Sequence, residues 1–152
     1  MFSRIYIEIT NICNMNCSFC HGHSRKLKQM TIEEFEVILD KISGYTEYIY
    51  YHLMGEPLTH PDLPEFIEIA TKKGFKSMIT TNGTLLNQRG DKILEAGIHK
   101  VNISVHSFED GTEEQFEYYL KNLVDFALKA HNKGVIVVFR LWNNGFDNGR
   151  NH

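Results

Sequence analysis

Three cysteines lie close together near the start of the chain, and no other cysteine occurs among its 152 residues. Cys13, Cys17 and Cys20 have the spacing Cys-x-x-x-Cys-x-x-Cys. An odd number of thiols this close together makes a poor disulfide framework, so the pattern indicates metal binding in a reducing compartment. Three thiolates can ligate three irons of a [4Fe-4S] cluster, which leaves the fourth iron open to a chelating molecule. An open metal position is typical of catalytic sites.

Two other interpretations of the thiols stay open. A structural zinc site of the Cys3His type would take its fourth ligand from His21 or His23, although zinc modules usually space their thiols in pairs. Unligated buried thiols are the second interpretation, and the polar loop that the thiols share counts against it.

The elements that must position these thiols alternate along the chain. Five segments have the composition or period-two alternation of strands, and four segments between them have helical spacing of apolar residues. The predicted strands are 4–10, 48–54, 75–80, 100–105 and 135–141. The predicted helices are a segment from the capping box of Thr31 and Glu34 to Gly44, then 64–73, 85–96 and 113–131. The last helix is expected to bury one stripe of Phe116, Tyr119, Leu120, Leu123, Val124, Ala127 and Leu128.

This alternation predicts an α/β fold with right-handed crossovers and a parallel sheet. A closed eight-stranded barrel takes about 250 residues, so we expect residues 1–152 to form one domain that is a partial parallel (β/α) barrel of about five βα units. The segment 135–139 would be an exposed apolar edge strand, which complete domains usually cover or charge. We therefore expect a chain that is truncated at its C-terminus.

Polar residues collect where the predicted strands end, which is the edge at which parallel α/β folds place their chemistry. The candidates outside the cysteine segment are Gly55, Glu56 and Pro57 after the second strand, Asn82 after the third, Asn102, Ser104 and His106 along the fourth, and Arg140 on the fifth. Each also has an ordinary structural interpretation: a turn with a solvated glutamate, satisfied polar groups at strand ends, or a solvated charge on an edge strand. His52 is expected to pack on the second strand, with a cavity position as the alternative. The acidic run from Glu109 to Glu117 is interpreted as a loop and a helix start.

The cysteine spacing resembles that of the radical S-adenosylmethionine (SAM) superfamily. The resemblance includes Phe19 just before the last cysteine and the segment Glu8-Ile-Thr-x-x-Cys-Asn, which ends at Asn14. It also includes Met54-Gly-Glu-Pro57, which is similar to the family's Gly-Gly-Glu-Pro motif. Met54 stands where the family has its first glycine. The resemblance implies a six-unit partial TIM barrel, here incomplete, from the branch that often carries a C-terminal domain with additional clusters.

The resemblance also implies a function. Cys13, Cys17 and Cys20 would hold the [4Fe-4S] cluster, and SAM bound at its open iron would be cleaved reductively to a 5'-deoxyadenosyl radical that abstracts hydrogen from an unidentified substrate. Gly55 and Glu56 would receive the SAM ammonium, and Ser104 would bond its ribose or carboxylate. The family's arginine after the fourth strand is missing, so Arg140 or an absent C-terminal part would bind the SAM carboxylate. Phe19, Pro57 and Asn82 would complete the SAM site. The expected partners are a small-molecule or peptide substrate and a reductant such as ferredoxin or flavodoxin.

Composition narrows the class of protein. Hydrophobic residues make up 42% of the chain and the formal net charge is −3, which fits a globular domain. Neither nucleic acid nor an anionic membrane would be attracted by the whole-molecule charge, so neither is an expected partner. No apolar run suits a secretory signal or a membrane span, and we expect a cytoplasmic protein. A non-catalytic iron-sulfur or zinc binding module and an inactive fragment of a longer enzyme remain the alternatives.

Overall fold

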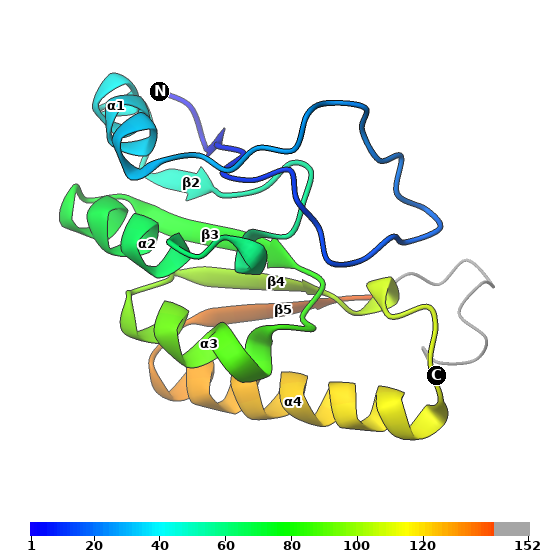
Figure 1. Ribbon diagram of the computed structural model, residues 1–152. Helices are drawn as coiled ribbons and strands as arrows, with labels where there is room; N and C mark the ends of the chain where they lie inside the picture. The colour runs from blue at the N-terminus through cyan, green and yellow to red at the C-terminus, as the bar shows by residue number, and fades with distance from the viewer. Residues whose placement is uncertain (142–152) are drawn as a thin grey trace.

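The computed structural model describes residues 1–141. Its five strands form a single parallel sheet in the order β1-β2-β3-β4-β5 (Figure 1). The strands are β1 (Ile5–Tyr6), β2 (Tyr48–Tyr50), β3 (Lys76–Thr81), β4 (Lys100–Ser104) and β5 (Ile136–Arg140). The helices are α1 (Ile32–Ile42), α2 (Leu63–Lys72), α3 (Leu86–Glu95) and α4 (Glu113–Asn132), with short 3-10 turns η1 (Pro57–Thr59) and η2 (Val105–Ser107). The predicted α/β class and parallel sheet are therefore confirmed.

Local sequence signals set the ends of the helices. Thr31 and Glu34 form the predicted capping box of α1, in which each side chain bonds the other residue's main-chain N–H. Thr112 and Gln115 form the same reciprocal pair at the start of α4. The main-chain groups that a helix start leaves unpaired are thereby satisfied without any tertiary contact.

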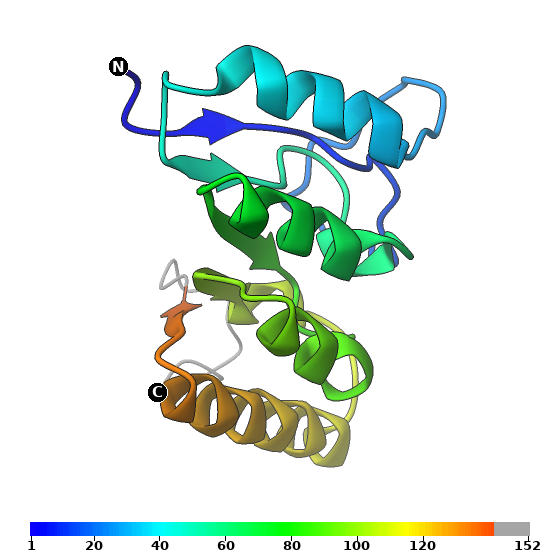
Figure 2. The same ribbon diagram turned by 90° about the vertical axis from the view of Figure 1, so that its left-hand side faces the viewer.

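The four α-helices lie on one side of the sheet (Figure 2), and the core fills the space between them. Along the strands every second side chain points to this core, which buries aliphatic residues of the first four strand segments and aromatic residues of the helices, while Val137 of β5 is partly buried against it. Its fully buried members include Ile9, Ile49, Ile79, Val101, Ile103, Phe35, Phe66 and Leu123. The other face of the sheet carries no helix within residues 1–141, and we call it the helix-free face.

The first two strands are shorter than predicted. After Tyr6 the chain stays extended, but Ile9 accepts a hydrogen bond from Met30 N and Thr10 pairs in antiparallel fashion with Gln29. The segment returning from the cysteines therefore takes the place of a neighbouring strand. Local alternation could not predict this partner, because it lies about twenty residues further along the chain.

The predicted stripe of α4 was partly wrong. Val124 and Leu128 are exposed, whereas Phe126 and Ala130 are buried with Tyr119 and Leu123. The reason is a close approach of α3, where a Cβ added to Gly90 would lie 2.6 Å from Phe126 Cδ2. The helix is rotated so that Phe126 packs over this glycine.

The far edge of the described sheet is β5, as predicted. It pairs with β4 from Lys100↔Ile136 to Ser104↔Arg140, and the side chains of Ile136 and Phe139 are 47% and 43% exposed. Within residues 1–141 no helix is both long and apolar enough to cross a membrane.

Candidate active site at the cysteine loop

The three thiols lie on an excursion of residues 11–28, which we call the cysteine loop. It leaves the sheet at the ends to which the strand arrows point and passes close to η2 (Figure 1). Cys13 and Cys20 are exposed, Cys17 is half-buried, and none of them is in a disulfide. Cys20 N donates to Cys17 O at 3.0 Å, which closes a turn around the last two thiols. The predicted position at the carboxyl edge of the sheet is confirmed.

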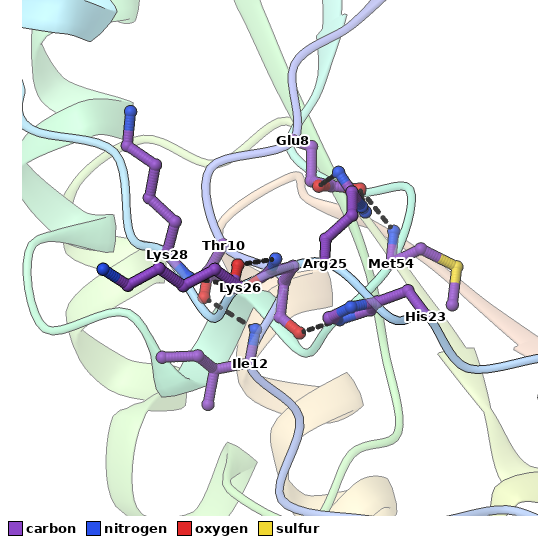
Figure 3. Close-up of polar contacts among 9 residues, drawn as sticks. Glu8, Thr10, Ile12, His23, Arg25, Lys26, Lys28 and Met54 are labelled. Carbon is purple, nitrogen blue, oxygen red and sulfur yellow. Dashed lines mark hydrogen bonds and ion pairs between the residues drawn. The ribbon is translucent and has the colours of Figure 1, made fainter.

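Asn11 closes the two ends of the cysteine loop against each other. Figure 3 shows its partners His23, Lys26 and Lys28. Its side chain donates to Lys26 O at 2.9 Å and accepts from Lys28 N at 2.8 Å, while its main-chain N–H donates to Lys28 O. The ring Nε2 of His23 bonds Asn11 O at 2.8 Å. These contacts hold the two ends of the loop together at its base, so the three thiols lie on one closed loop.

Gly55 brings the turn after β2 against this base. It has φ +85°, and a Cβ there would lie 2.6 Å from Thr10 O and 2.9 Å from two main-chain atoms of Asn11. The next residue, Glu56, donates its main-chain N–H to Ile12 O at 2.8 Å. Only a glycine permits this approach, because any side chain would meet backbone that cannot move aside.

The carboxylate of Glu56 is buried and joins three donors. It accepts from Leu58 N at 3.0 Å, Thr81 Oγ1 at 2.7 Å and Asn82 N at 2.8 Å, and the residue is 2% exposed. Burial raises the pKa of this carboxyl, while the three donors act in the opposite direction. The side chain thus ties the turn after β2 to the end of β3, and the carbonyl of Glu56 is also taken, by Thr59 N and Oγ1.

Asn82 connects the end of β3 to the cysteine loop. Its Nδ2 donates to Asn14 Oδ1 at 2.9 Å, and its Oδ1 accepts from Thr84 N and Oγ1. Thr84 Oγ1 in turn accepts from Asn14 Nδ2 at 2.9 Å, and Tyr119 OH donates to Asn82 O at 2.7 Å. Asn14 lies between the first two thiols, so this network holds the tip of the loop from one side.

The segment after β4 holds the tip from the other side. Cys17 Sγ contacts Ser107 O at 3.7 Å, Ser18 N donates to a Glu109 carboxylate oxygen at 2.6 Å, and Ser18 Oγ donates to the second oxygen. The predicted site residue Phe19 packs on the His106 ring with centroids 5.1 Å apart. Glu109 lies in the loop before α4, as predicted, and it also binds the backbone between two thiols, a contact that the sequence did not indicate.

Ser104 and Arg140 face the same edge further along the sheet. They are register partners in β4 and β5, Ser104 is half-buried, and the Arg140 side chain is exposed. The alternation along β4 follows the prediction, with Val101, Ile103 and Val105 buried and the polar residues between them half-buried. His106 Nδ1 bonds Arg140 O at 3.1 Å, which joins η2 to the end of β5.

The donor set agrees with a three-thiolate site, although the side chains are not gathered into a finished one. Among residues 1–141 no three His, Cys, Asp or Glu side chains are close enough to hold a metal ion together. Burial raises the pKa of the Cys13 and Cys17 thiols, so metal binding would have to release their protons. His23 Nε2 is already bonded to Asn11 O at the loop base, and His21 is exposed. The residues thus offer three sulfurs on one tethered loop.

Sequence reasoning missed several residues that position this loop. Thr84, Ser107 and Glu109 contact it from segments far along the chain, and Arg25 joins its return arm to Glu8. Only Glu8 and Asn14 carried a sequence signal, since both belong to the motif Glu8-Ile-Thr-x-x-Cys-Asn quoted for the family resemblance. The others have polar side chains in loops, where nothing local separates a tether from a solvated residue.

Comparison with known proteins identifies the domain. The family model described as the radical SAM superfamily matches residues 7–144. A probable GTP 3',8-cyclase of Methanocaldococcus jannaschii is 37% identical over 65% of this chain and 35% of the relative. An Fe-coproporphyrin III synthase of Methanosarcina barkeri is 29% identical over 82% of this chain and 32% of the relative. The chain therefore spans about a third of the length of these curated relatives.

Solved structures agree on the fold. The crystal structure of BtrN in complex with AdoMet and 2-DOIA has a TM-score of 0.70 at 24% sequence identity, over 91% of this chain and 56% of BtrN. Methylornithine synthase (PylB) has a TM-score of 0.61 at 18% identity, over 91% of this chain and 44% of PylB. At these identities the likeness establishes a shared architecture and no more.

Proposed function

The chain belongs to the radical SAM superfamily, and we propose from this premise that its cysteine loop holds a [4Fe-4S] cluster through Cys13, Cys17 and Cys20 and serves the reductive cleavage of SAM. The observation that carries the proposal is the placement of three thiols on one tethered loop at the carboxyl edge of a parallel sheet. The curated relatives are named as enzymes, and this chain carries the family's domain.

A bound cluster supplies the electron that breaks a carbon–sulfur bond of SAM, giving methionine and a 5'-deoxyadenosyl radical that abstracts hydrogen from the substrate. The chain's own residues must orient SAM and exclude water around it. The base of the cysteine loop and the turn at Gly55 are in contact, so a ligand at the thiols would also meet this turn.

Glu56 shapes the proposed SAM site by holding the turn at Gly55 in place. Because its carboxylate and its carbonyl are bonded to protein donors, we place the SAM ammonium against the main-chain carbonyls of Met54 and Gly55. Pro57 is buried and starts η1, which fixes the exit of the same turn. The carboxylate of Glu56 then acts by holding the turn in place.

The remaining candidates surround this seat. Phe19 and Asn82 hold opposite sides of the cysteine loop, and Ser104 offers a hydroxyl at the end of β4 for the ribose or carboxylate of SAM. The SAM carboxylate takes its positive partner from Arg140 or from a part of the protein beyond this chain. The proposed reductant is a ferredoxin or flavodoxin, and the proposed substrate is a small molecule or a peptide. The relatives' names, which include GTP and Fe-coproporphyrin III, favour a small molecule.

Anaerobic reconstitution tests the proposal. The protein should take up about four irons and four sulfides, and after reduction it should convert SAM to 5'-deoxyadenosine. Cys17→Ala should lose the iron, whereas His21→Ala, which removes an exposed ring from the same loop, should keep it. A protein that retains zinc and loses it equally in both variants would instead be the Cys3His binding module.

The inactive-fragment alternative needs a separate comparison. A cluster that assembles in this chain but cleaves SAM only in a version extended past His152 would assign binding to these residues and catalysis to the longer protein. Equal cleavage by both versions would exclude the fragment interpretation.

A further inference from the structure

The helix-free face carries Ser104 and Arg140, which are candidates for the SAM site, and further side chains that the cluster and SAM do not account for. Strand pairing places Tyr6, Tyr50, Met78, Thr80, Asn102, Ser104, Val138 and Arg140 on this face, since register partners point the same way and side chains alternate along each strand. The four helices lie on the opposite side of the sheet (Figure 2). These residues lie on the sheet itself, to one side of the cysteine loop.

One corner of this face is aromatic. The rings of Tyr6 and Tyr50 are stacked, with centroids 5.0 Å apart and planes 18° from parallel. The ring of His52 meets both edge-on, at 5.6 Å from Tyr6 and 5.3 Å from Tyr50. Tyr50 is 8% exposed, but Tyr6 on the edge strand is 44% exposed. We call these three residues the aromatic corner, and its exposed member offers a flat surface for stacking.

His52 lacks a partner for one of its ring nitrogens. Its Nδ1 is buried and has no hydrogen-bond partner within residues 1–141. Burial, together with the positive charge of Arg140, lowers the pKa of His52 to about 4, so the ring is neutral near pH 7. A buried polar atom without a partner is costly in the folded protein.

The charge on the same face is positive. The five strands contain Lys76, Lys100 and Arg140, and they contain no carboxylate. Glu8, the acid that follows β1, is bonded on both oxygens to Arg25. Besides burial, the positive charge of Arg140 lowers the pKa values of both His52 and His106, and Nδ1 of His106 bonds the main-chain oxygen of Arg140. A guanidinium presents paired donors that match a carboxylate.

We propose that the helix-free face binds the substrate of the proposed radical reaction, and that this substrate combines a flat ring with a carboxylate. The ring stacks on Tyr6, beside the neutral imidazole of His52, and Arg140 binds the carboxylate. The inference rests on the proposed function for the identity of the ligand as a substrate. It assigns Arg140 to the substrate, so that the SAM carboxylate takes its partner elsewhere.

The test uses 2-naphthoate as the probe, titrated into the reconstituted full chain in the presence of SAM. Naphthalene-2-carboxamide keeps the ring without the charge, and cyclohexanecarboxylate keeps the charge without the flat ring. We expect 2-naphthoate to bind at least tenfold more tightly than either analogue. Equal binding of all three compounds would overturn the substrate class.

Variants test which residue binds the carboxylate of the probe and which binds its ring. Arg140→Gln should abolish the preference for the acid over the amide, and Tyr6→Leu should abolish the preference for the flat ring. Lys121→Gln, which removes an exposed cation from α4, should leave both preferences intact. If Arg140→Gln or Tyr6→Leu folds as judged by circular dichroism and still shows both preferences, the assignment is wrong.

The proposed function is tested by measurements other than probe binding. Iron content and 5'-deoxyadenosine formation by the unaltered chain report on the cluster and SAM. A protein that cleaves SAM without discriminating the three probes loses this inference and keeps the proposed function. A protein that discriminates the probes but takes up no iron loses the proposed function.

Discussion

The cysteine loop with its supporting turns and the aromatic corner lie at neighbouring strands, yet they differ in how far their buried polar groups are paired. In the loop support, which we define as Asn11, Ile12, Gly55, Glu56 and Asn82, buried side chains and backbone groups bond to one another, although Nδ1 of the adjacent His23 is buried without a partner within the described residues. In the aromatic corner, the buried Nδ1 of His52 has no partner within the described residues, and the ring of Tyr6 is half-exposed.

The difference separates a support from a binding surface. A satisfied buried network is rigid, because each bond that opens leaves a partner unpaired in a region of low dielectric. An unsatisfied buried group, by contrast, costs free energy in the folded protein. We infer that the loop support fixes the position of the thiols, whereas the exposed ring of Tyr6 in the aromatic corner is available to bind a ligand.

The largest expected effect comes from breaking the support at Gly55. Gly55→Ala adds a Cβ 2.6 Å from Thr10 O in a backbone with φ +85°. Gly74→Ala is the matched control, because Gly74 has the same φ and nothing within 4 Å of its added Cβ. Left-handed strain alone costs about 1 kcal/mol, and overpacking adds roughly 1–3 kcal/mol at Gly55. Urea unfolding of both variants measures the difference, and equal losses would show that the close approach is not important.

Much of this support was predictable from the sequence, and its details were not. The thiol spacing, the Gly-Glu-Pro turn and the capping box of α1 are local patterns whose physical cause lies within a few residues. The partners of Glu56 and the tether from Ser18 to Glu109 join distant segments, and they depend on how the sheet brings strand ends together.

The aromatic corner was also only partly predictable from the sequence. Alternation along β2 placed Tyr50 and His52 on one face, but it could not tell which of them would lack a partner. That outcome depends on Tyr6 from β1 and on the charge of Arg140 from β5. The stripe of α4 was misjudged for a related reason, because Phe126 is buried by a glycine on another helix.

The second largest effect is a loss of stability at low pH, caused by the buried ring of His52 in the aromatic corner. The pKa of His52 is about 4 in the folded protein, below the 6.5 of a free imidazole. The unfolded chain therefore binds the proton more readily, and stability falls as the pH drops below about 6.5. Between pH 7 and pH 5 this group alone should lower the free energy of unfolding by about 2 kcal/mol.

His52→Phe should remove that share of the pH dependence. Urea unfolding at pH 7 and pH 5 measures it in the unaltered protein, in His52→Phe and in His131→Phe, where His131 is an exposed residue at the end of α4. Other histidines with lowered pKa values contribute equally to all three proteins and cancel in the comparison. The same fall in His52→Phe as in the control would mean that the corner carries no buried neutral ring.

The smallest effect concerns the residue that connects the two regions. Glu8 lies two residues after Tyr6 of the corner, bonds Arg25 on the return arm of the cysteine loop, and accepts from Met54 N at 3.0 Å beside the loop support. The hydrogen bonds from Arg25 hold the pKa of Glu8 below its usual value. A carboxyl whose pKa is lowered by folding stabilises the protein above its unfolded pKa, and that contribution disappears as the pH falls through the folded value.

Glu8→Gln should therefore be less stable than the unaltered protein at pH 7, and the gap should close as the pH falls below about 4.5, the ordinary value for this carboxyl. Because Arg25 is largely exposed, added salt should also narrow the gap at pH 7. Arg25→Gln should reproduce the loss, and the double variant should add little to it, since both changes break one pair. Hydrogen exchange of the Met54 amide gives the local readout: it should become faster in Glu8→Ala, which removes the acceptor, and stay slow in Arg25→Gln, where the acceptor remains. If the amide exchanges equally fast in both variants, Glu8 contributes only through the ion pair and the two regions are not joined through this carboxylate.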